Sequence, residues 1–127
     1  MLLKDFFEII KQTRISDQEI LTQIRINPGH GLFAGHFPGN PVVPGVVSVQ
    51  LINDILSDAL GMELITTEAK SIKFISMIQP QINSELSINI KYENSAEGTF
   101  KVLSEIFAFE TVFTKFNGIL KTKELLQ

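Results

Sequence analysis

The segment from Gly35 to Val47 constrains this chain more than any other part of the sequence. Its thirteen residues include three glycines, three prolines and one histidine. Each proline fixes its own φ angle and disfavours helix at the residue before it, whereas each glycine permits backbone angles that other residues avoid. A regular helix or central strand cannot run through such a segment. We therefore expect a restrained loop that holds His36 in place and ends where a helix begins.

Apolar periodicity predicts the remaining elements. The clearest signal is the strict alternation of apolar and polar residues over 82–92, which is typical of a half-buried antiparallel strand. The full set comprises an amphipathic helix over Leu2–Thr13, a helix over Val46–Leu60 that ends at Gly61, and strands over about 19–26, 63–76, 82–92, 99–107 and 111–120. This order predicts one α+β domain over residues 1–127, with a largely antiparallel sheet.

Composition excludes several classes of protein. The chain has no cysteine, and its two histidines do not have the spacing of a zinc motif, so we expect neither thiolate chemistry nor a metal site. A net charge of −3 argues against nucleic acid as the main partner. The first residues lack the pattern of a signal peptide, and no apolar run is long enough to span a membrane. We therefore expect a soluble cytoplasmic protein.

The predicted elements also indicate self-association. One central helix cannot cover both faces of a sheet of five strands, and the sequence contains ten phenylalanines. Exposed sheet faces that carry so many apolar residues would associate. We expect a homodimer or a higher oligomer.

The predicted helix from Val46 has two distinct faces at 100° per residue. The apolar face, expected to meet the core, consists of Val49, Ile52, Ile55, Leu56 and Ala59. The opposite face consists of Gln50, Asn53, Asp54 and Ser57, with Asp58 at its edge. This polar stripe either faces water or lines an interface or cleft that faces the histidine loop. Gln50 and Asp54 are four residues apart and therefore adjacent on the helix surface.

The start of this helix has the features of an anion site. The N–H groups near Gly45 and Val46 have no intrahelical partners, and they carry the positive end of the helix dipole. They can therefore stabilise a carbonyl oxygen that becomes an enolate-like anion. With His36 as a base, the local pattern predicts abstraction of a proton next to a carbonyl group.

The segment His36-Phe37-Pro38-Gly39-x-Pro41-x-x-Pro44-Gly45-Val46 closely resembles the signature of the FabZ-type 3-hydroxyacyl-(acyl-carrier-protein) dehydratases. A weaker likeness continues through the stretch 70–80, and the architecture corresponds over about 17–120. The resemblance implies the hotdog fold, in which an antiparallel sheet wraps around one central helix and two copies form a double-hotdog dimer. It also implies a function in fatty acid or related lipid or polyketide synthesis, without a metal or organic cofactor.

The resemblance implies roles for individual residues as well. His36 would remove the C2 proton of a 3-hydroxyacyl thioester on acyl carrier protein or coenzyme A, and the Gly45 N–H would hold the thioester carbonyl. A carboxylate fourteen residues after the histidine, from the other subunit, would help the 3-hydroxyl leave as water. The acyl chain would lie in an apolar tunnel between the two helices of the dimer.

This sequence departs from that pattern at the acidic position. Residue 50 is glutamine, and an amide cannot transfer a proton as a carboxylic acid does. The family usually has glutamine one turn later, where this chain has Asp54. We hypothesise that Asp54 supplies the acid while Gln50 orients the hydroxyl or a water. Alternatively the acid is lost, or a related subunit supplies it in a hetero-oligomer.

Other residues and functions have two interpretations each. His30 is either an ordinary loop histidine or a second polar group near the mouth of the site, and Phe33 and Phe37 are expected to be wall or core residues. Lys70 and Lys73 either attract an acidic carrier protein or are ordinary surface lysines. The alternative functions are a hotdog acyl thioesterase, with Asp54 activating water, and a non-catalytic acyl-binding or partner subunit.

Overall fold

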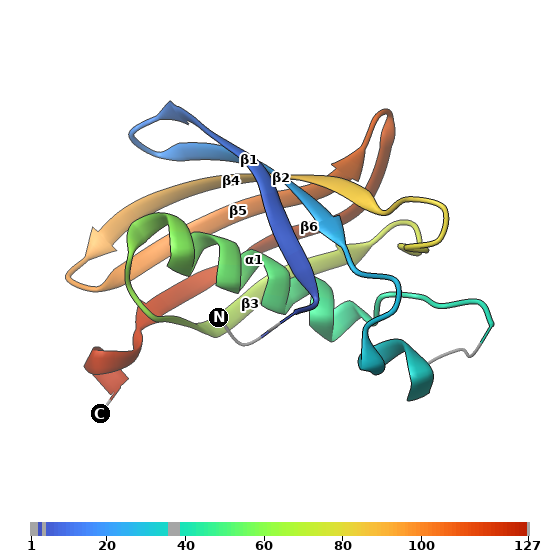
Figure 1. The fold of residues 1–127 in the computed structure, drawn as a ribbon. Helices are drawn as coiled ribbons and strands as arrows, with labels where there is room; N and C mark the ends of the chain where they lie inside the picture. Colours follow the sequence, from blue (N-terminus) through green and yellow to red (C-terminus); the bar gives the residue numbers. More distant parts are fainter. Residues whose placement is uncertain (1–2, 4, 36–38, 127) are drawn as a thin grey trace.

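The described part of the chain forms a six-stranded antiparallel sheet around one long helix (Figure 1). A computed structural model describes residue 3 and residues 5–35 and 39–126. The strands lie in the order β1-β2-β4-β5-β6-β3. The elements are β1 (Phe7–Ser16), β2 (Glu19–Ile26), the 3₁₀ turn η1 (Gly31–Gly35), α1 (Gly45–Leu60), β3 (Leu64–Phe74), β4 (Glu85–Ala96), β5 (Thr99–Ala108), β6 (Thr111–Thr122) and the 3₁₀ turn η2 (Lys123–Leu126).

Most of the predicted elements are confirmed. The strand over 19–26 and the helix that ends before Gly61 occur as predicted, and β3 to β6 match the four later strands to within a few residues. Gly61 has a φ of 65°, the left-handed conformation that glycine adopts without strain. Its N–H donates to the Asp58 carbonyl, and the Met62 N–H donates to the Ser57 carbonyl. These bonds satisfy carbonyls at the helix end, which explains why α1 stops there.

The predicted N-terminal helix is wrong, because residues 7–16 form strand β1. This strand pairs antiparallel with β2 and is an edge of the sheet, which is why the prediction also missed a sixth strand. Phe7 is the only residue of β1 that is buried, so the strand has no clear alternation of apolar and polar residues. Pairing with β2 therefore overrides the helical spacing of the apolar residues near Phe7.

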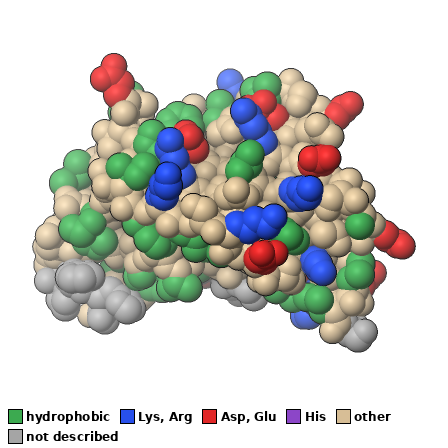
Figure 2. Space-filling model, turned by 180° about the vertical axis from the view of Figure 1, so that it is seen from behind, with side chains coloured by type: hydrophobic (Ala, Val, Ile, Leu, Met, Phe, Trp, Pro, Cys, Tyr) green, Lys and Arg blue, Asp and Glu red, His purple; other side chains and the backbone are tan. Residues whose placement is uncertain are grey.

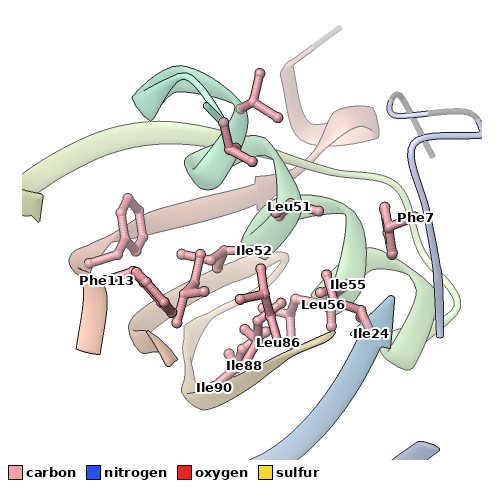
Figure 3. Close-up of a cluster of buried hydrophobic side chains, with 14 of the residues drawn as sticks. Phe7, Ile24, Leu51, Ile52, Ile55, Leu56, Leu86, Ile88, Ile90 and Phe113 are labelled. Carbon is pink, nitrogen blue, oxygen red and sulfur yellow. The ribbon is translucent and has the colours of Figure 1, made fainter. Parts of the chain in front are cut away.

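The core lies between α1 and the concave side of the sheet. Figure 3 shows Leu51, Ile52, Ile55 and Leu56 of the helix close to the apolar side chains of β4. The β4 contribution comes from the alternating residues Leu86, Ile88 and Ile90, each at most 2% exposed. Burial of a side chain of this size contributes about 1.5–3 kcal/mol, so this layer is the main source of stability for the helix. Val49 and Ala59, predicted in the core, are only partly buried at its border.

Two residues of the polar stripe do not face water. Asn53 and Asp54 are 5% and 2% exposed, because β3 packs against Asn53 and the N-terminal segment at Leu3 covers Asp54. The Asn53 amide donates to the Leu64 carbonyl at 2.8 Å and accepts from the Thr66 hydroxyl at 2.9 Å. Ser57 accepts from the Leu64 N–H and donates to the Asn53 carbonyl. Asn53 and Ser57 therefore attach the helix to the start of β3.

The outer face of the sheet is more polar than expected. Figure 2 shows this face, where Lys, Arg, Asp and Glu side chains are interspersed with hydrophobic ones. Lys115 and Glu105 form an ion pair there at 3.6 Å, and Leu103 is an exposed apolar residue. This face is a mixture of charged and apolar side chains, so the expectation that uncovered sheet faces drive association stays a prediction. Among the described helices, none is long and apolar enough to cross a membrane.

We predict that Asn53→Ala lowers the free energy of unfolding by about 2 kcal/mol, because it leaves the Leu64 carbonyl and the Thr66 hydroxyl without their partner. Asp58→Ala is the matched control on the exposed side of the same helix, with an expected change within about 0.5 kcal/mol. Urea denaturation followed by circular dichroism measures both. Equal effects of the two substitutions would show that Asn53 does not attach α1 to β3.

Candidate active site

The predicted catalytic histidine, His36, lies outside the described residues, as does Phe37. The structure describes both ends of their loop: η1 ends at Gly35, and the chain continues from Gly39 to the N-terminus of α1. Gly39 has a φ of 87°, which favours glycine at this position of the motif. The role of His36 as a base therefore stays a prediction, whereas the helix N-terminus beside its loop can be described in detail.

Helix α1 begins at Gly45, one residue before the predicted start, and Pro44 is its N-cap residue. The N–H groups of Val47 and Ser48 both donate to the Pro44 carbonyl, at 2.9 and 3.2 Å. The N–H groups of Gly45 and Val46 precede this turn and point out of the helix end, where the dipole is positive. They are placed to bind an oxygen that gains negative charge.

Gly45 also permits a close contact that no other residue would allow. A Cβ atom at this position would lie 2.7 Å from Cζ of Phe74, which is closer than carbon atoms pack. The Phe74 ring therefore lies against the backbone at the start of α1. Phe74 is the last residue of β3, so this contact brings the edge strand next to the helix N-terminus.

An apolar groove opens beside Gly45. Its volume is about 400 Å³, and its walls come from the segment before α1, the first turn of the helix and the chain after β3. A hydrogen bond from the Val43 N–H to the Ile78 carbonyl, at 2.9 Å, joins the two loop walls. The groove has the size and lining of a site for a small apolar ligand, with the N–H groups of the helix at one end.

Gln50 and Asp54, which have the amide and the carboxylate in the reverse of the family's usual order, are in direct contact. The Gln50 Nε2 donates to Asp54 Oδ1 at 2.8 Å. The other carboxylate oxygen, Oδ2, accepts from the backbone N–H of Leu3 at 2.9 Å. Both oxygens of Asp54 are therefore engaged, and its side chain is enclosed, whereas Gln50 is partly exposed. Gln50 is the more accessible of the two.

The contact with Leu3 could not be predicted, because it joins residues 51 positions apart. The segment before β1 is held over α1 by Phe6, which is fully buried. The Phe6 ring packs edge-on against His30, with 5.3 Å between ring centroids, and lies 5.5 Å from the Phe33 ring. Phe33 is thus a buried residue, as predicted.

His30 takes part in this packing and in the geometry of its own loop. Its Nδ1 accepts a hydrogen bond from the Leu32 N–H at 3.0 Å, so in the neutral ring the proton is on Nε2. Its ring supports Phe6 and, through it, the segment that carries Leu3. His30 therefore contacts the N-terminal segment that carries Leu3, and its alternative role as a polar group near the mouth of the site stays a prediction.

Other charged groups are dispersed. Lys70 and Lys73 are exposed on β3, so their proposed attraction of an acidic carrier stays a prediction. Within the described residues, no group of three or more His, Asp or Glu side chains is close enough together to hold a metal ion. The described polar groups therefore form two sets: the helix N-terminus, which borders the groove, and the Gln50–Asp54 pair, neither member of which lines it.

An antiparallel sheet around one central helix, with a ligand groove at the helix N-terminus, defines a protein of the hotdog fold. A family model described as "ApeI-like: ApeI dehydratase" matches residues 12–112. The chain therefore belongs to the ApeI-like dehydratase family.

Curated relatives support the resemblance stated from the sequence. A 3-hydroxyacyl-(acyl-carrier-protein) dehydratase FabZ of Rickettsia bellii is 23% identical over 127 residues, which cover 93% of this chain and 88% of the relative. A FabZ of Ligilactobacillus salivarius is 27% identical and covers 84% of this chain and 78% of the relative.

Solved structures confirm the fold. A chain of the dehydratase heterocomplex ApeI:P of Xenorhabdus doucetiae superposes with a TM-score of 0.71 at 18% identity, covering 90% of this chain and 96% of that one. A thioesterase of Haemophilus influenzae superposes with a TM-score of 0.64 at 15% identity, covering 99% and 85%. At these identities the likeness concerns the fold and does not distinguish a dehydratase from a thioesterase.

Proposed function

We propose that this protein removes water from a 3-hydroxyacyl thioester carried on acyl carrier protein and, in reverse, hydrates the enoyl product. The observation that carries the proposal is the apolar groove at the N-terminus of α1 in a chain that belongs to a dehydratase family. A thioester needs a site where an apolar chain meets a donor for the carbonyl oxygen. The groove and the N–H of Gly45 supply those two parts.

The proposed reaction begins with His36 taking the C2 proton of the substrate. The electron pair of that C–H bond moves to the thioester carbonyl, and the resulting enolate oxygen is stabilised by the Gly45 N–H and the positive end of the helix dipole. The pair then returns to form the C2–C3 double bond while the C3–O bond breaks. The departing hydroxyl takes a proton and leaves as water. No metal or organic cofactor takes part in these steps.

We assign the second half of the reaction to the Gln50–Asp54 pair of a second copy of the chain, because neither residue lines the groove of its own chain. Gln50 orients the 3-hydroxyl, and Asp54 is the source of its proton. The 2.8 Å contact supports this assignment, because it links the accessible amide to the carboxyl group that an acid requires. Asp54 has to reach the hydroxyl through a water or after exchange of its bond with Leu3.

We also propose that a second copy of the chain pairs along β3. Most residues of this edge strand are exposed, and apolar side chains lie exposed along it and just beyond it, at Ile65, Phe74 and Ile75. An unpaired edge of this kind can add a strand from another molecule. Pairing there would bring the second copy next to the groove beside Gly45. A related subunit in place of the second copy is the hetero-oligomeric alternative.

The first test is a two-product assay of the purified protein with a 3-hydroxyacyl thioester on acyl carrier protein and on coenzyme A. We expect enoyl thioester to form faster from the acyl-carrier-protein substrate, without release of free thiol. His36→Ala is expected to lower the rate by about 10²–10⁴-fold, because it removes the base. Asp58→Ala, on the exposed side of α1, is the control and is expected to keep the wild-type rate.

Three outcomes of that assay would contradict the proposal in different ways. Free thiol without enoyl product would identify a thioesterase. The absence of both products would indicate an acyl-binding or partner subunit. Activity that occurs only after a related subunit is added would place the missing acid on that partner.

A second test concerns the acid. Asp54→Asn keeps the shape of the side chain but removes its proton, so we expect kcat to fall by about 10²-fold or more. Gln50→Glu is the companion variant and is expected to give no gain, because an acid is already present. A wild-type rate in Asp54→Asn, or a large gain in Gln50→Glu, would show that Asp54 is not the acid. Thermal unfolding of both variants controls for loss of structure.

A third test concerns assembly. We expect the wild-type protein to have the mass of a dimer or a higher oligomer in light scattering. The double substitution Ile65→Lys and Ile75→Lys should give monomers, because it places charges along β3. The matched control, Ile10→Lys and Ile15→Lys, changes exposed residues of β1 at the opposite edge and should leave the mass unchanged. A monomeric wild type, or dissociation in the control, would refute the β3 interface.

A further inference from the structure

The groove beside Gly45 contains two buried hydroxyl groups that the proposed reaction does not use. Its apolar lining comes from Val42, Val43, Phe74, Ile75, Met77 and Ile78. Ser48 and Thr114 line the same groove and are only 2% and 1% exposed. Polar groups this deeply placed in an apolar wall normally have hydrogen-bond partners.

Neither hydroxyl has a hydrogen-bond partner within residues 3, 5–35 and 39–126. Every side-chain nitrogen or oxygen that is fully sealed in that part of the chain does have a partner. The oxygens of Ser48 and Thr114 are therefore not sealed inside the protein. Since both residues line the groove, their hydroxyls reach its surface and are free to donate a hydrogen bond to whatever occupies it.

The two hydroxyls come from different elements. Ser48 lies three residues after Gly45 on α1, so the two residues share one face of the helix. A helical side chain leans toward the N-terminus, which brings the Ser48 hydroxyl toward the end of the groove where the Gly45 N–H lies. Thr114 belongs to β6 and pairs with Phe74 of β3 in the sheet. The hydroxyls thus arise from the helix wall and the sheet wall of one groove.

This arrangement determines which acyl chains bind best in the groove. A hydrocarbon chain in the groove would displace water from both hydroxyls and leave them without partners, which costs free energy. A chain with an oxygen acceptor at that depth would restore the bonds. Sites built to hydrogen-bond a polar group reject analogues that lack it much more strongly than apolar pockets reject a missing methylene.

We propose that Ser48 and Thr114 form a polar subsite that selects acyl thioesters with an oxygen acceptor, such as a carbonyl or ether oxygen, in the acyl chain beyond the reacting carbons. This inference rests on the proposed function, because it takes the groove to be the acyl site. The hydroxyls donate to the acceptor oxygen, and they determine specificity without taking part in proton transfer.

The test measures binding without catalysis. The probes are saturated acyl-pantetheine amides, which have no 3-hydroxyl and cannot lose water, with one methylene replaced by an ether oxygen at successive positions beyond C4. Calorimetry gives the Kd of each probe and of the all-methylene parent. We expect one position, or two adjacent ones, to bind about ten-fold more tightly than the parent in the wild type.

Variants locate the effect. Ser48→Ala and Thr114→Val should each remove most of that preference while the Kd of the parent stays the same or improves. Ser76→Ala is the matched control, because Ser76 lines the same groove but is exposed, and it should keep the preference. Thermal unfolding reports whether each variant folds. If a variant does not fold, the Kd values of the ether probes for the wild type still test the inference.

Several results would overturn the inference. The inference is wrong if the all-methylene parent is the tightest ligand of the wild type, or if the ether preference survives in both Ser48→Ala and Thr114→Val. An equal loss of affinity for the parent and the ether probes would place the hydroxyls at the pantetheine or thioester end instead. Failure of the proposed function gives a different result. The dehydration assay would then show no enoyl product, whereas calorimetry would still show the ether preference.

Discussion

Enclosure of α1 by the sheet is the constraint on which the rest of this structure depends. A helix whose inner side is covered by strands cannot leave the polar side chains of that side in water, so each of them has to find a partner inside the fold. Asn53 and Ser57 bind the start of β3, and Asp54 binds Gln50 and Leu3. The polar groups of the helix thereby fix its rotation and its position along the sheet.

Fixing the helix also fixes the site. The contact between Gly45 and Phe74 joins the start of α1 to the end of β3. The hydrogen bond of Asn53 to Leu64 joins the same helix to the start of β3, so it helps to fix how the two elements lie against each other. The groove is therefore held between two attachments on one edge strand. A site built on a helix and a strand in this way keeps its geometry better than one formed by loops alone.

The sequence predicts the fold well where the signal is local. The alternation over 82–92 and the glycine at 61 indicate β4 and the end of α1, because each reflects a property of neighbouring residues. Strand β1 could not be recognised, since a nearly fully exposed edge strand has no buried face to impose alternation. The burial of Asn53 could not be predicted for a related reason. A polar residue on a helix has the pattern of a surface residue unless its partner, here the Leu64 carbonyl, is known. At the site, the motif around Gly45 was visible in the sequence, whereas Leu3 and Thr114 carry no local signal of their place beside it.

The bond between Leu3 and Asp54 has a practical consequence for handling the protein. A purification tag joined ahead of residue 1 would lie close to Asp54, the carboxyl group that we assign to the reaction, because Leu3 binds it. The other end of the described chain is different: the Lys123 N–H donates to the Glu63 carbonyl near the C-terminal end of α1, at the opposite end of the helix from Gly45 (Figure 1). A fusion there leaves the N-terminal segment in its native contact, so C-terminal tags are the appropriate choice for kinetic work.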